Sequence, residues 1–238
     1  MKSGALEFRG TQLRQNTMNI EQARFNMIEQ QIRPWDVLDA GVLELLAVVR
    51  REDFVPAAYR ALAFVDTEVP LPTTSGETQA MLAPRVEARL LQELEVHKHE
   101  RVLEVGAGSG FMAALLAHKA QHVTTLEIDP GLARFARANL QRAGLMNATV
   151  IEADGANGWR GEAPFDVIVL SGSVPELPEA LLAQLKVGGR LVAIVGHEPV
   201  MRAVLVSRNG EAGLNRQVLF DTVAPRLLGF DEPTKFQF

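Results

Sequence analysis

Three glycines at alternate positions, Gly106, Gly108 and Gly110, follow closely after the acidic residue Glu104 at the end of an apolar run. Glycine lets the backbone turn tightly and approach a ligand, because no Cβ stands in the way. The alanine-rich apolar pattern at 112–117 predicts a helix, whose first turn offers unpaired N–H groups and the positive end of the helix dipole. A strand, a glycine turn and a helix in this order are typical of a site that binds a nucleotide.

The spacing of the glycines and of a second acid distinguishes between kinds of nucleotide. In a dinucleotide-binding fingerprint, G-x-G-x-x-G, the third glycine would stand where this chain has Phe111, one residue after Gly110. Glu127 ends the next apolar run, 122–127, about 20 residues beyond the first glycine. A carboxylate there can accept hydrogen bonds from both ribose hydroxyls. An NAD site and a turn that binds no ligand are the alternatives.

The two acids and the shortened glycine turn together resemble the cofactor site of class I S-adenosylmethionine-dependent methyltransferases. The resemblance implies that S-adenosyl-L-methionine is the cofactor. Its methionine end would be held by five residues, namely Glu104, Gly106, Ala107, Gly108 and Gly110. The resemblance also implies that Glu127 binds the ribose and that Ile128 lies against the adenine.

Composition excludes several other classes of protein. The 238 residues carry a formal net charge of −5 and a pI of about 5.6, so we expect no broad basic surface that binds nucleic acid. The chain has no cysteine, which excludes disulfides, thiolate nucleophiles and zinc–thiolate sites, and we predict no metal site. No apolar run reaches the roughly 18 residues of a membrane span, so no membrane partner is expected. We predict a cytoplasmic protein.

Periodicity predicts an α/β protein with a mostly parallel sheet, preceded by an N-terminal helical segment. The resemblance implies that this sheet is doubly wound and of the Rossmann-like class I methyltransferase type. Residues 1–17 are polar and are expected to form a disordered leader, and 18–238 to form a single methyltransferase domain. Within that domain, 18–97 is expected to hold the N-terminal helices and a substrate loop, and 98–238 the cofactor-binding core.

Apolar runs and helical patterns alternate through this core. Parallel strands are expected at 101–105, 122–127, 148–152, 165–170 and 189–195. Helices are expected at 84–94, 110–119, 130–143 and 178–185. Asp36 is predicted to cap an earlier helix, and Asp129 precedes a helix that starts at Pro130. A C-terminal antiparallel hairpin is expected from 200–207 and 214–220, turned by Asn209 and Gly210, because Asn-Gly supplies positive φ angles.

Over about residues 20 to 225 the chain resembles the protein-L-isoaspartate O-methyltransferases. The stretches that carry the resemblance are 27–33, 48–56, 70–72, 154–159, 165–178 and 185–196. The resemblance implies that Asp154, beside Gly155, approaches the adenine amino group. It further implies that the substrate is an isoaspartyl carboxylate in a damaged protein or peptide, and hence a role in protein repair.

One stretch departs from this family. The family's substrate loop reads G-x-G-Q-T-I-S-x-P, and its serine is the residue usually assigned to catalysis. Counting back from Pro84 places that serine at Leu82, whereas counting forward from Pro72 places it at Ala80. Neither side chain carries a hydroxyl.

The same loop, 73–84, offers Ser75 and Thr78 as other hydroxyls, and we name both as candidate catalytic residues. Methyl transfer from a sulfonium is an in-line displacement, and an isoaspartyl carboxylate is already ionised at neutral pH, so no general base is required. The protein must align the reactants and exclude water. We therefore expect the loop to cover the transferring methyl group.

Two other functions are compatible with these residues. One is a methyltransferase of the same scaffold with another substrate, and the other is an S-adenosylmethionine-binding module without catalysis. Ser171 and Ser173 follow the fourth parallel strand at its carboxyl end, where open α/β sheets bind ligands. These serines are expected either to face the substrate or to belong to a plain loop.

Overall fold

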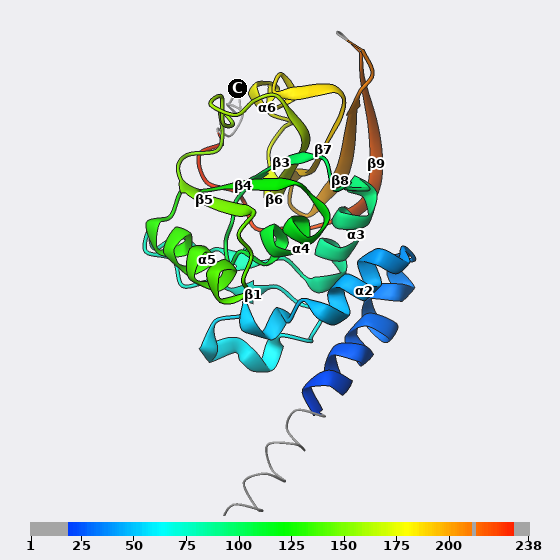
Figure 1. Cartoon of the computed structure of the whole chain (residues 1–238), viewed down its shortest axis with the longest axis vertical. Coiled ribbons are helices and arrows are strands. Elements are labelled where there is room, and N and C mark those ends of the chain that lie inside the picture. The colour runs from blue at the N-terminus through cyan, green and yellow to red at the C-terminus, as the bar shows by residue number, and fades with distance from the viewer. Residues whose placement is uncertain (1–18, 211–212, 231–238) are drawn as a thin grey trace, which may run out of the picture.

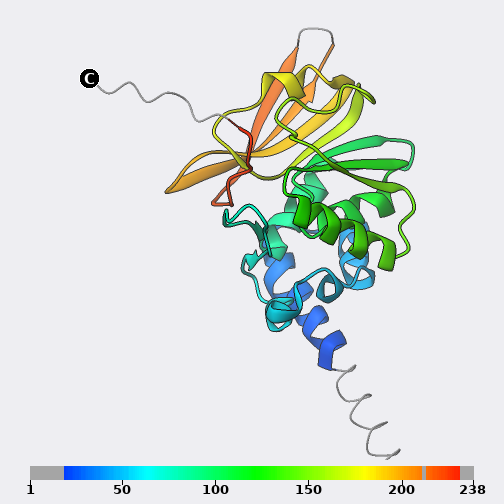
Figure 2. The ribbon, with the colours of Figure 1, turned by 90° about the vertical axis from the view of Figure 1, so that its left-hand side faces the viewer.

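The computed structural model of the protein describes residues 19–210 and 213–230. The leader predicted at 1–17 lies outside these residues, and the division of the domain between 97 and 98 stays a prediction. Figures 1 and 2 show a central sheet with an N-terminal helical layer, in blue and cyan, on one side.

The central sheet has the strand order β5-β4-β3-β6-β7-β8-β9. Its strands are β3 (Arg101–Val105), β4 (His122–Glu127), β5 (Ala148–Glu152), β6 (Phe165–Val174), β7 (Leu185–His197), β8 (Val200–Arg208) and β9 (Leu214–Thr222). Strands β3 to β7 pair in parallel, whereas β8 and β9 pair antiparallel. The predicted α/β class, with a mostly parallel sheet and a C-terminal antiparallel hairpin, is confirmed.

The helical elements precede the sheet or connect its strands. After a helical stretch at 19–27 they are the π-helix η1 (Ile28–Ile32), the 3-10 helices η2 (Arg33–Trp35), η3 (Arg51–Asp53) and η4 (Ala57–Leu62), and the α-helices α2 (Ala40–Val48), α3 (Pro84–Leu94), α4 (Phe111–Lys119), α5 (Pro130–Arg142) and α6 (Glu179–Leu182). Two short strands, β1 (Val69–Pro70) and β2 (Ala80–Met81), pair antiparallel before α3.

The parallel strands are buried on both faces of the sheet. Val102 and Val167 face the layer that contains α3, α4, α5 and the N-terminal helices. Leu103 and Ile168, the next residues along the same two strands, pack on the other face with Leu181 of α6. Burial of both faces explains why these strands are near-continuous apolar runs in the sequence.

The capping residue predicted for helix α2 is wrong. Asp36 has a φ of +59° at the end of η2, which is not the extended conformation of an N-cap. Asp39 caps the helix instead, because its carboxylate accepts a hydrogen bond from the Val42 N–H at 2.8 Å. The 3-10 turn that continues the first helix moves the start of α2 to Ala40.

The turn between β8 and β9 also differs from the prediction. A two-residue Asn-Gly turn needs positive φ at both residues, but of the pair only Gly210 has one, at +85°. The connection spans 209–213, and the Asn209 N–H donates to the Gly213 carbonyl oxygen at 2.7 Å. The hairpin is therefore closed by a longer loop.

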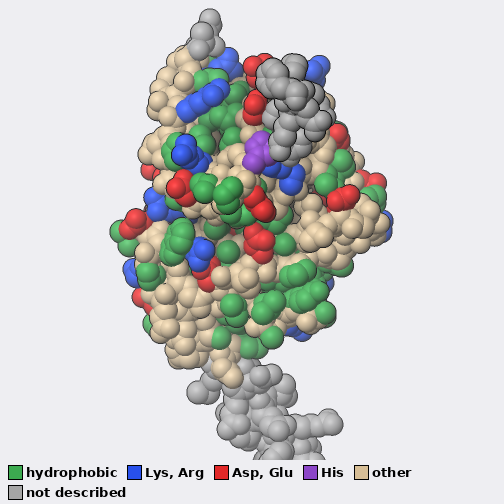
Figure 3. Space-filling model, turned by 180° about the vertical axis from the view of Figure 1, so that it is seen from behind, with side chains coloured by type: hydrophobic (Ala, Val, Ile, Leu, Met, Phe, Trp, Pro, Cys, Tyr) green, Lys and Arg blue, Asp and Glu red, His purple; other side chains and the backbone are tan. Residues whose placement is uncertain are grey.

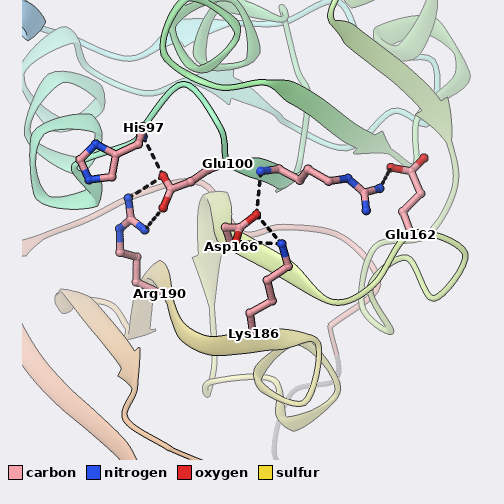
Figure 4. A network of polar contacts seen from close by, with 7 residues as sticks. His97, Glu100, Glu162, Asp166, Lys186 and Arg190 are labelled. Carbon is pink, nitrogen blue, oxygen red and sulfur yellow. Dashed lines mark hydrogen bonds and ion pairs between the residues drawn. The ribbon is translucent and has the colours of Figure 1, made fainter.

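An ionic network joins the amino ends of β3, β6 and β7 (Figure 4). Arg190 pairs with Glu100 at 2.6 Å, and Lys186 pairs with Asp166 at 2.8 Å. Asp166 also accepts a hydrogen bond from the Arg101 N–H at 2.9 Å. These contacts stabilise the edge of the sheet at which the parallel strands begin. They leave the opposite edge, formed by the carboxyl ends of the strands, available for a site.

The surface combines charged and apolar side chains. Basic and acidic side chains are interspersed over the face shown in Figure 3. Large exposed apolar side chains include Phe25, Leu38 and Val48. Within 19–210 and 213–230, no helix is both long enough and apolar enough to cross a membrane.

Arg51 joins the N-terminal segment to α3 inside the protein. Its side chain is 1% exposed and forms an ion pair with the buried carboxylate of Glu87. The guanidinium also donates to the Leu82 carbonyl oxygen at 2.9 Å and lies 4.9 Å from the centroid of the Phe111 ring. A buried charge whose partner is removed is left without compensation, which is strongly destabilising.

We expect Arg51→Ala to lower the free energy of unfolding by about 3–5 kcal/mol, because it leaves Glu87 without its ion-pair partner. Arg50→Ala is the matched control, since Arg50 is 61% exposed and its ion pairs are expected to contribute less than about 1 kcal/mol. Urea titration of both variants measures the difference. Equal losses in the two variants would contradict a special role for the buried pair.

Candidate active site

The glycine turn between β3 and α4 consists largely of left-handed backbone. The φ angle is +91° at Gly106, +52° at Gly108 and +82° at Gly110. A Cβ at Gly110 would lie 3.3 Å from the Ala136 backbone of α5, so glycine also permits close packing of turn and helix. The Gly106 N–H donates to the Leu126 carbonyl oxygen at 2.8 Å, which ties the turn to the end of β4.

The carboxylate of Glu127 fixes the second half of this turn. Its Oε2 accepts a hydrogen bond from the Gly108 N–H at 2.8 Å, and its Oε1 accepts one from the Asp129 N–H at 3.0 Å. The side chain is largely buried, and burial raises the pKa of Glu127 although both N–H groups oppose the shift. The Glu127 carboxylate is thus in direct contact with the glycine turn.

Glu104, at the end of β3, is completely buried. The Ser171 hydroxyl donates to its Oε1 at 2.6 Å, while Oε2 accepts no hydrogen bond from the described part of the chain. Burial raises the pKa of Glu104 to about 8, with the Ser171 hydrogen bond opposing the shift. At neutral pH this carboxyl is therefore mostly protonated.

A pocket lies at the carboxyl ends of β3, β4 and β6, where the strand order reverses on either side of β3. Its empty space is about 490 Å³ with the open mouth included. The lining residues are Leu71, Gln79, Ala80, Val105, Gly106, Gly108, Leu126, Glu127, Ile128, Leu132, Ala153, Gly155, Ser171, Leu227 and Leu228. Ligands of open α/β sheets bind at such a reversal.

The pocket is apolar beside Glu127 and polar beside Ser171. Ile128 follows Glu127 directly and is 38% exposed, and Leu132 of α5 lines the same region. The Ala153 N–H donates to the Glu127 carbonyl oxygen at 3.0 Å, which places the end of β5 there as well. An aromatic base fits the apolar region, and a charged or polar group fits the side next to Ser171.

Comparison with known proteins places the chain in one family. A family model described as protein-L-isoaspartate(D-aspartate) O-methyltransferase matches residues 22–223. The chain belongs to this family. A protein-L-isoaspartate O-methyltransferase 1 of Syntrophobacter fumaroxidans is 40% identical over 194 residues, which cover 82% of this chain and 89% of that protein. A protein-L-isoaspartate O-methyltransferase of Rhodopseudomonas palustris is 41% identical over 204 residues, which cover 85% of this chain and 92% of that protein.

Solved structures show the same fold. A protein-L-isoaspartate O-methyltransferase structure matches with a TM-score of 0.73 at 24% identity, covering 87% of this chain and 66% of that chain. A Plasmodium falciparum structure, described as a beta-aspartate methyltransferase in complex with S-adenosyl-L-homocysteine, matches with a TM-score of 0.69 at 23% identity. That match covers 85% of this chain and 96% of that chain.

The structure brings most of the predicted cofactor residues together. Those that line the pocket are Gly106, Gly108, Glu127, Ile128 and Gly155. Glu104 does not line the pocket but accepts a hydrogen bond from Ser171, which does. Ala107 and Gly110 belong to the glycine turn and do not line the pocket. Asp154 is exposed, accepts a hydrogen bond from the Ala156 N–H at 2.9 Å and lies against Gly229 instead of lining the pocket.

The candidate residues in loop 73–84 differ in whether they line the pocket. Ser75 and Thr78 are exposed and do not line the pocket, so their catalytic role stays a prediction. Ala80 of β2 lines the pocket, whereas Leu82 is buried and lines a separate cavity beside Trp35. Of the two positions that could correspond to the family's serine, only position 80 faces the pocket.

Several lining residues were not among the predicted site residues, and Gln79, Leu71 and Leu227 are three of them. Gln79 and Leu71 come from the β1–β2 connection, and Leu227 comes from the segment after β9. The segment after β9 reaches the pocket by pairing with β6. The Leu227 N–H donates to the Ser173 carbonyl oxygen at 2.9 Å, and the Ser173 N–H donates to the Pro225 carbonyl oxygen at 2.7 Å. No local pattern in the sequence signals this pairing.

The raised pKa of Glu104 has a measurable consequence for stability. Because the folded state holds this proton more tightly, the contribution of Glu104 is fully present below about pH 4.5 and is lost as the pH rises through about 8. We therefore expect the free energy of unfolding to fall less over this range in Glu104→Gln than in the wild type, measured by urea titration at several pH values. Glu152→Gln, which changes an exposed carboxyl at the end of β5, is the control and should keep the wild-type slope. If the free energy of unfolding fell as steeply with pH in Glu104→Gln as in the wild type, the raised pKa of Glu104 would be contradicted.

Proposed function

We propose that this protein transfers a methyl group from S-adenosyl-L-methionine to the side-chain carboxylate of an isoaspartyl residue in proteins or peptides. The observation that carries the proposal is the pocket between the glycine turn and Glu127, in a chain that belongs to the protein-L-isoaspartate(D-aspartate) O-methyltransferase family. The pocket walls provide each kind of contact that the cofactor's three parts require.

The residues present fit this cofactor. Glu127 would bind the ribose hydroxyls, and Ile128 and Leu132 would contact the adenine. Glu104 supports the fit through its unpartnered Oε2, because a buried polar atom without a hydrogen bond is costly unless a ligand satisfies it. When bound, the cofactor supplies an electrophilic methyl group on a sulfonium.

The chain's own residues align the acceptor and exclude water. Leu71 and Leu227 are close to the glycine turn, since a Cβ at Gly108 would lie 3.1 Å from Leu71 and one at Gly106 would lie 2.6 Å from Leu227. Apolar side chains at this position keep water away from a charged nucleophile. The acceptor carboxylate is ionised at neutral pH, so the site needs no general base and works by proximity.

A second candidate function is favoured by one observation. Neither Ala80 nor Leu82 carries the hydroxyl that the family's substrate loop provides, which favours a methyltransferase of the same scaffold with a different acceptor. A cofactor-binding module without catalysis follows from the same observation. A role in protein repair is part of our main proposal and rests on the family resemblance alone, whereas the cytoplasmic location stays a prediction from the sequence.

Methyl transfer to synthetic peptides tests the main proposal. With labelled S-adenosyl-L-methionine, we expect label in an isoaspartyl peptide and none in its aspartyl counterpart. Glu127→Ala is expected to bind the cofactor at least about tenfold more weakly, because it removes acceptors for the ribose hydroxyls and for Gly108. Cofactor binding without label in either peptide would favour the second candidate, and no binding would contradict both.

Adding a hydroxyl to the loop tests which position faces the acceptor. Ala80→Ser is expected to raise kcat/KM for the isoaspartyl peptide by about tenfold, because a hydrogen bond to a charged group contributes roughly 1.5–3 kcal/mol. Leu82→Ser is the comparison, since Leu82 is 3% exposed and the change should destabilise the fold by about 2–4 kcal/mol without raising activity. If Leu82→Ser raised kcat/KM and Ala80→Ser did not, position 82 and not position 80 would be the one that faces the acceptor.

A further inference from the structure

The connection between β1 and β2 is a loop, 71–79, that begins and ends at the pocket. Leu71 and Gln79 at its two ends line the pocket, and the Leu71 N–H donates to the Gln79 carbonyl oxygen at 2.8 Å. The Gln79 amide also donates to the Arg226 carbonyl oxygen at 3.1 Å, so the loop meets the C-terminal segment drawn in red in Figure 2. A ligand enclosed in this pocket is therefore in contact with the base of the loop.

The tip of the loop is held by one carboxylate. Asp129 Oδ2 accepts hydrogen bonds from the N–H groups of Thr74 at 2.7 Å and Ser75 at 2.9 Å, and Oδ1 accepts one from the Thr74 hydroxyl at 2.9 Å. Within 19–210 and 213–230, Asp129 is the one residue outside the loop that hydrogen-bonds to residues 72–78. The position of the tip therefore depends on this side chain.

Asp129 also caps helix α5, and its Oδ1 serves both roles. Oδ1 accepts hydrogen bonds from the N–H groups of Gly131 at 2.7 Å and Leu132 at 2.9 Å. The side chain is 2% exposed. Burial by itself raises the pKa of Asp129, but hydrogen bonds from the N–H groups of Leu132, Ser75 and Thr74 outweigh it and hold the pKa well below its usual range. The carboxylate is thus charged and fully used by five donors.

Gly131 provides independent evidence that the helix end accommodates the loop. A Cβ at this position would lie 2.6 Å from the Thr74 methyl carbon and 2.9 Å from Asp129 Oδ1. A Cβ there would therefore require the Thr74 side chain or the Asp129 carboxylate to move. The helix itself does not require glycine there, because the φ angle lies outside the positive region.

We propose that Asp129 is a positioning residue that latches loop 71–79 over the cofactor pocket, so that release of the bound cofactor product requires these contacts to break. The inference rests on the proposed function, because it assumes that an adenosyl ligand occupies the pocket. The latch is linked to that ligand through one carboxylate, since Glu127 lines the pocket and accepts the Asp129 N–H.

The test measures release of S-adenosylhomocysteine from the full-length protein by stopped-flow displacement. Asp129→Asn keeps the size of the side chain but replaces one acceptor oxygen by a donor, so two loop N–H groups lose their acceptor. We expect release at least about tenfold faster than in the wild type. Gly131→Ala keeps the charge of the carboxylate but places a Cβ against Thr74 and Asp129 Oδ1, and it is expected to act in the same direction.

Asp39→Asn is the matched control. Asp39 caps α2 through the Val42 N–H and has no hydrogen bond to the loop in the described residues, so its release rate should equal that of the wild type. Hydrogen exchange of residues 72–79, measured without ligand, gives a readout that loss of a helix cap alone does not change. We expect faster exchange in Asp129→Asn and Gly131→Ala, and unchanged exchange in Asp39→Asn.

The outcomes separate this inference from the proposed function. Wild-type release rates in both Asp129→Asn and Gly131→Ala would overturn the latch, and so would unchanged exchange of 72–79 in Asp129→Asn. Failure of the wild type to bind S-adenosylhomocysteine would instead contradict the proposed function, while the exchange measurement would still support or overturn the latch.

Discussion

The close approach of the glycine turn to the end of β4 is the contact on which the rest of the site depends. The N–H groups of Gly106 and Gly108 donate to the Leu126 carbonyl oxygen and the Glu127 carboxylate, so one short segment receives hydrogen bonds from both ends of the turn. Side chains larger than hydrogen at these positions would meet Leu227 or the loop after β1. Glu127 then accepts the Asp129 N–H, which orients the residue that holds the loop tip. Turn, acid and covering loop therefore form one connected set of hydrogen bonds.

The bounds of three parallel strands could be predicted well from the sequence. The runs at 101–105, 122–127 and 148–152 are apolar with clear polar or glycine ends, and the structure gives β3, β4 and β5 the same bounds. Strands β6 and β7 are longer than predicted because they continue through glycine-containing stretches that are typical of turns. Their pairing is irregular there, with register shifts between Phe165 and Val167 and between Val169 and Ser173, so the sheet accommodates these residues without ending.

The site could be predicted only as far as its chemistry is local in the sequence. The glycines and the acids Glu104 and Glu127 lie at strand ends that periodicity identifies. Contacts between distant segments have no such signal, and the pair of Ser171 with Glu104 is one example. Asp129 makes one contact of each kind. Its position before a proline predicted the helix cap, which is local in the sequence. Its contact with Thr74 joins distant segments and depends on where the β1–β2 connection folds.

The segment after β9 has a consequence for the order in which the protein becomes functional. Synthesis proceeds from the amino terminus, and domains acquire structure as segments emerge. A nascent chain that has emerged through β7 already contains the glycine turn, Glu104 and Glu127, but it lacks Leu227, which packs over Gly106. The pocket consequently gains the wall formed by Leu227 only after synthesis of β8 and β9, when the segment that follows β9 has paired with β6.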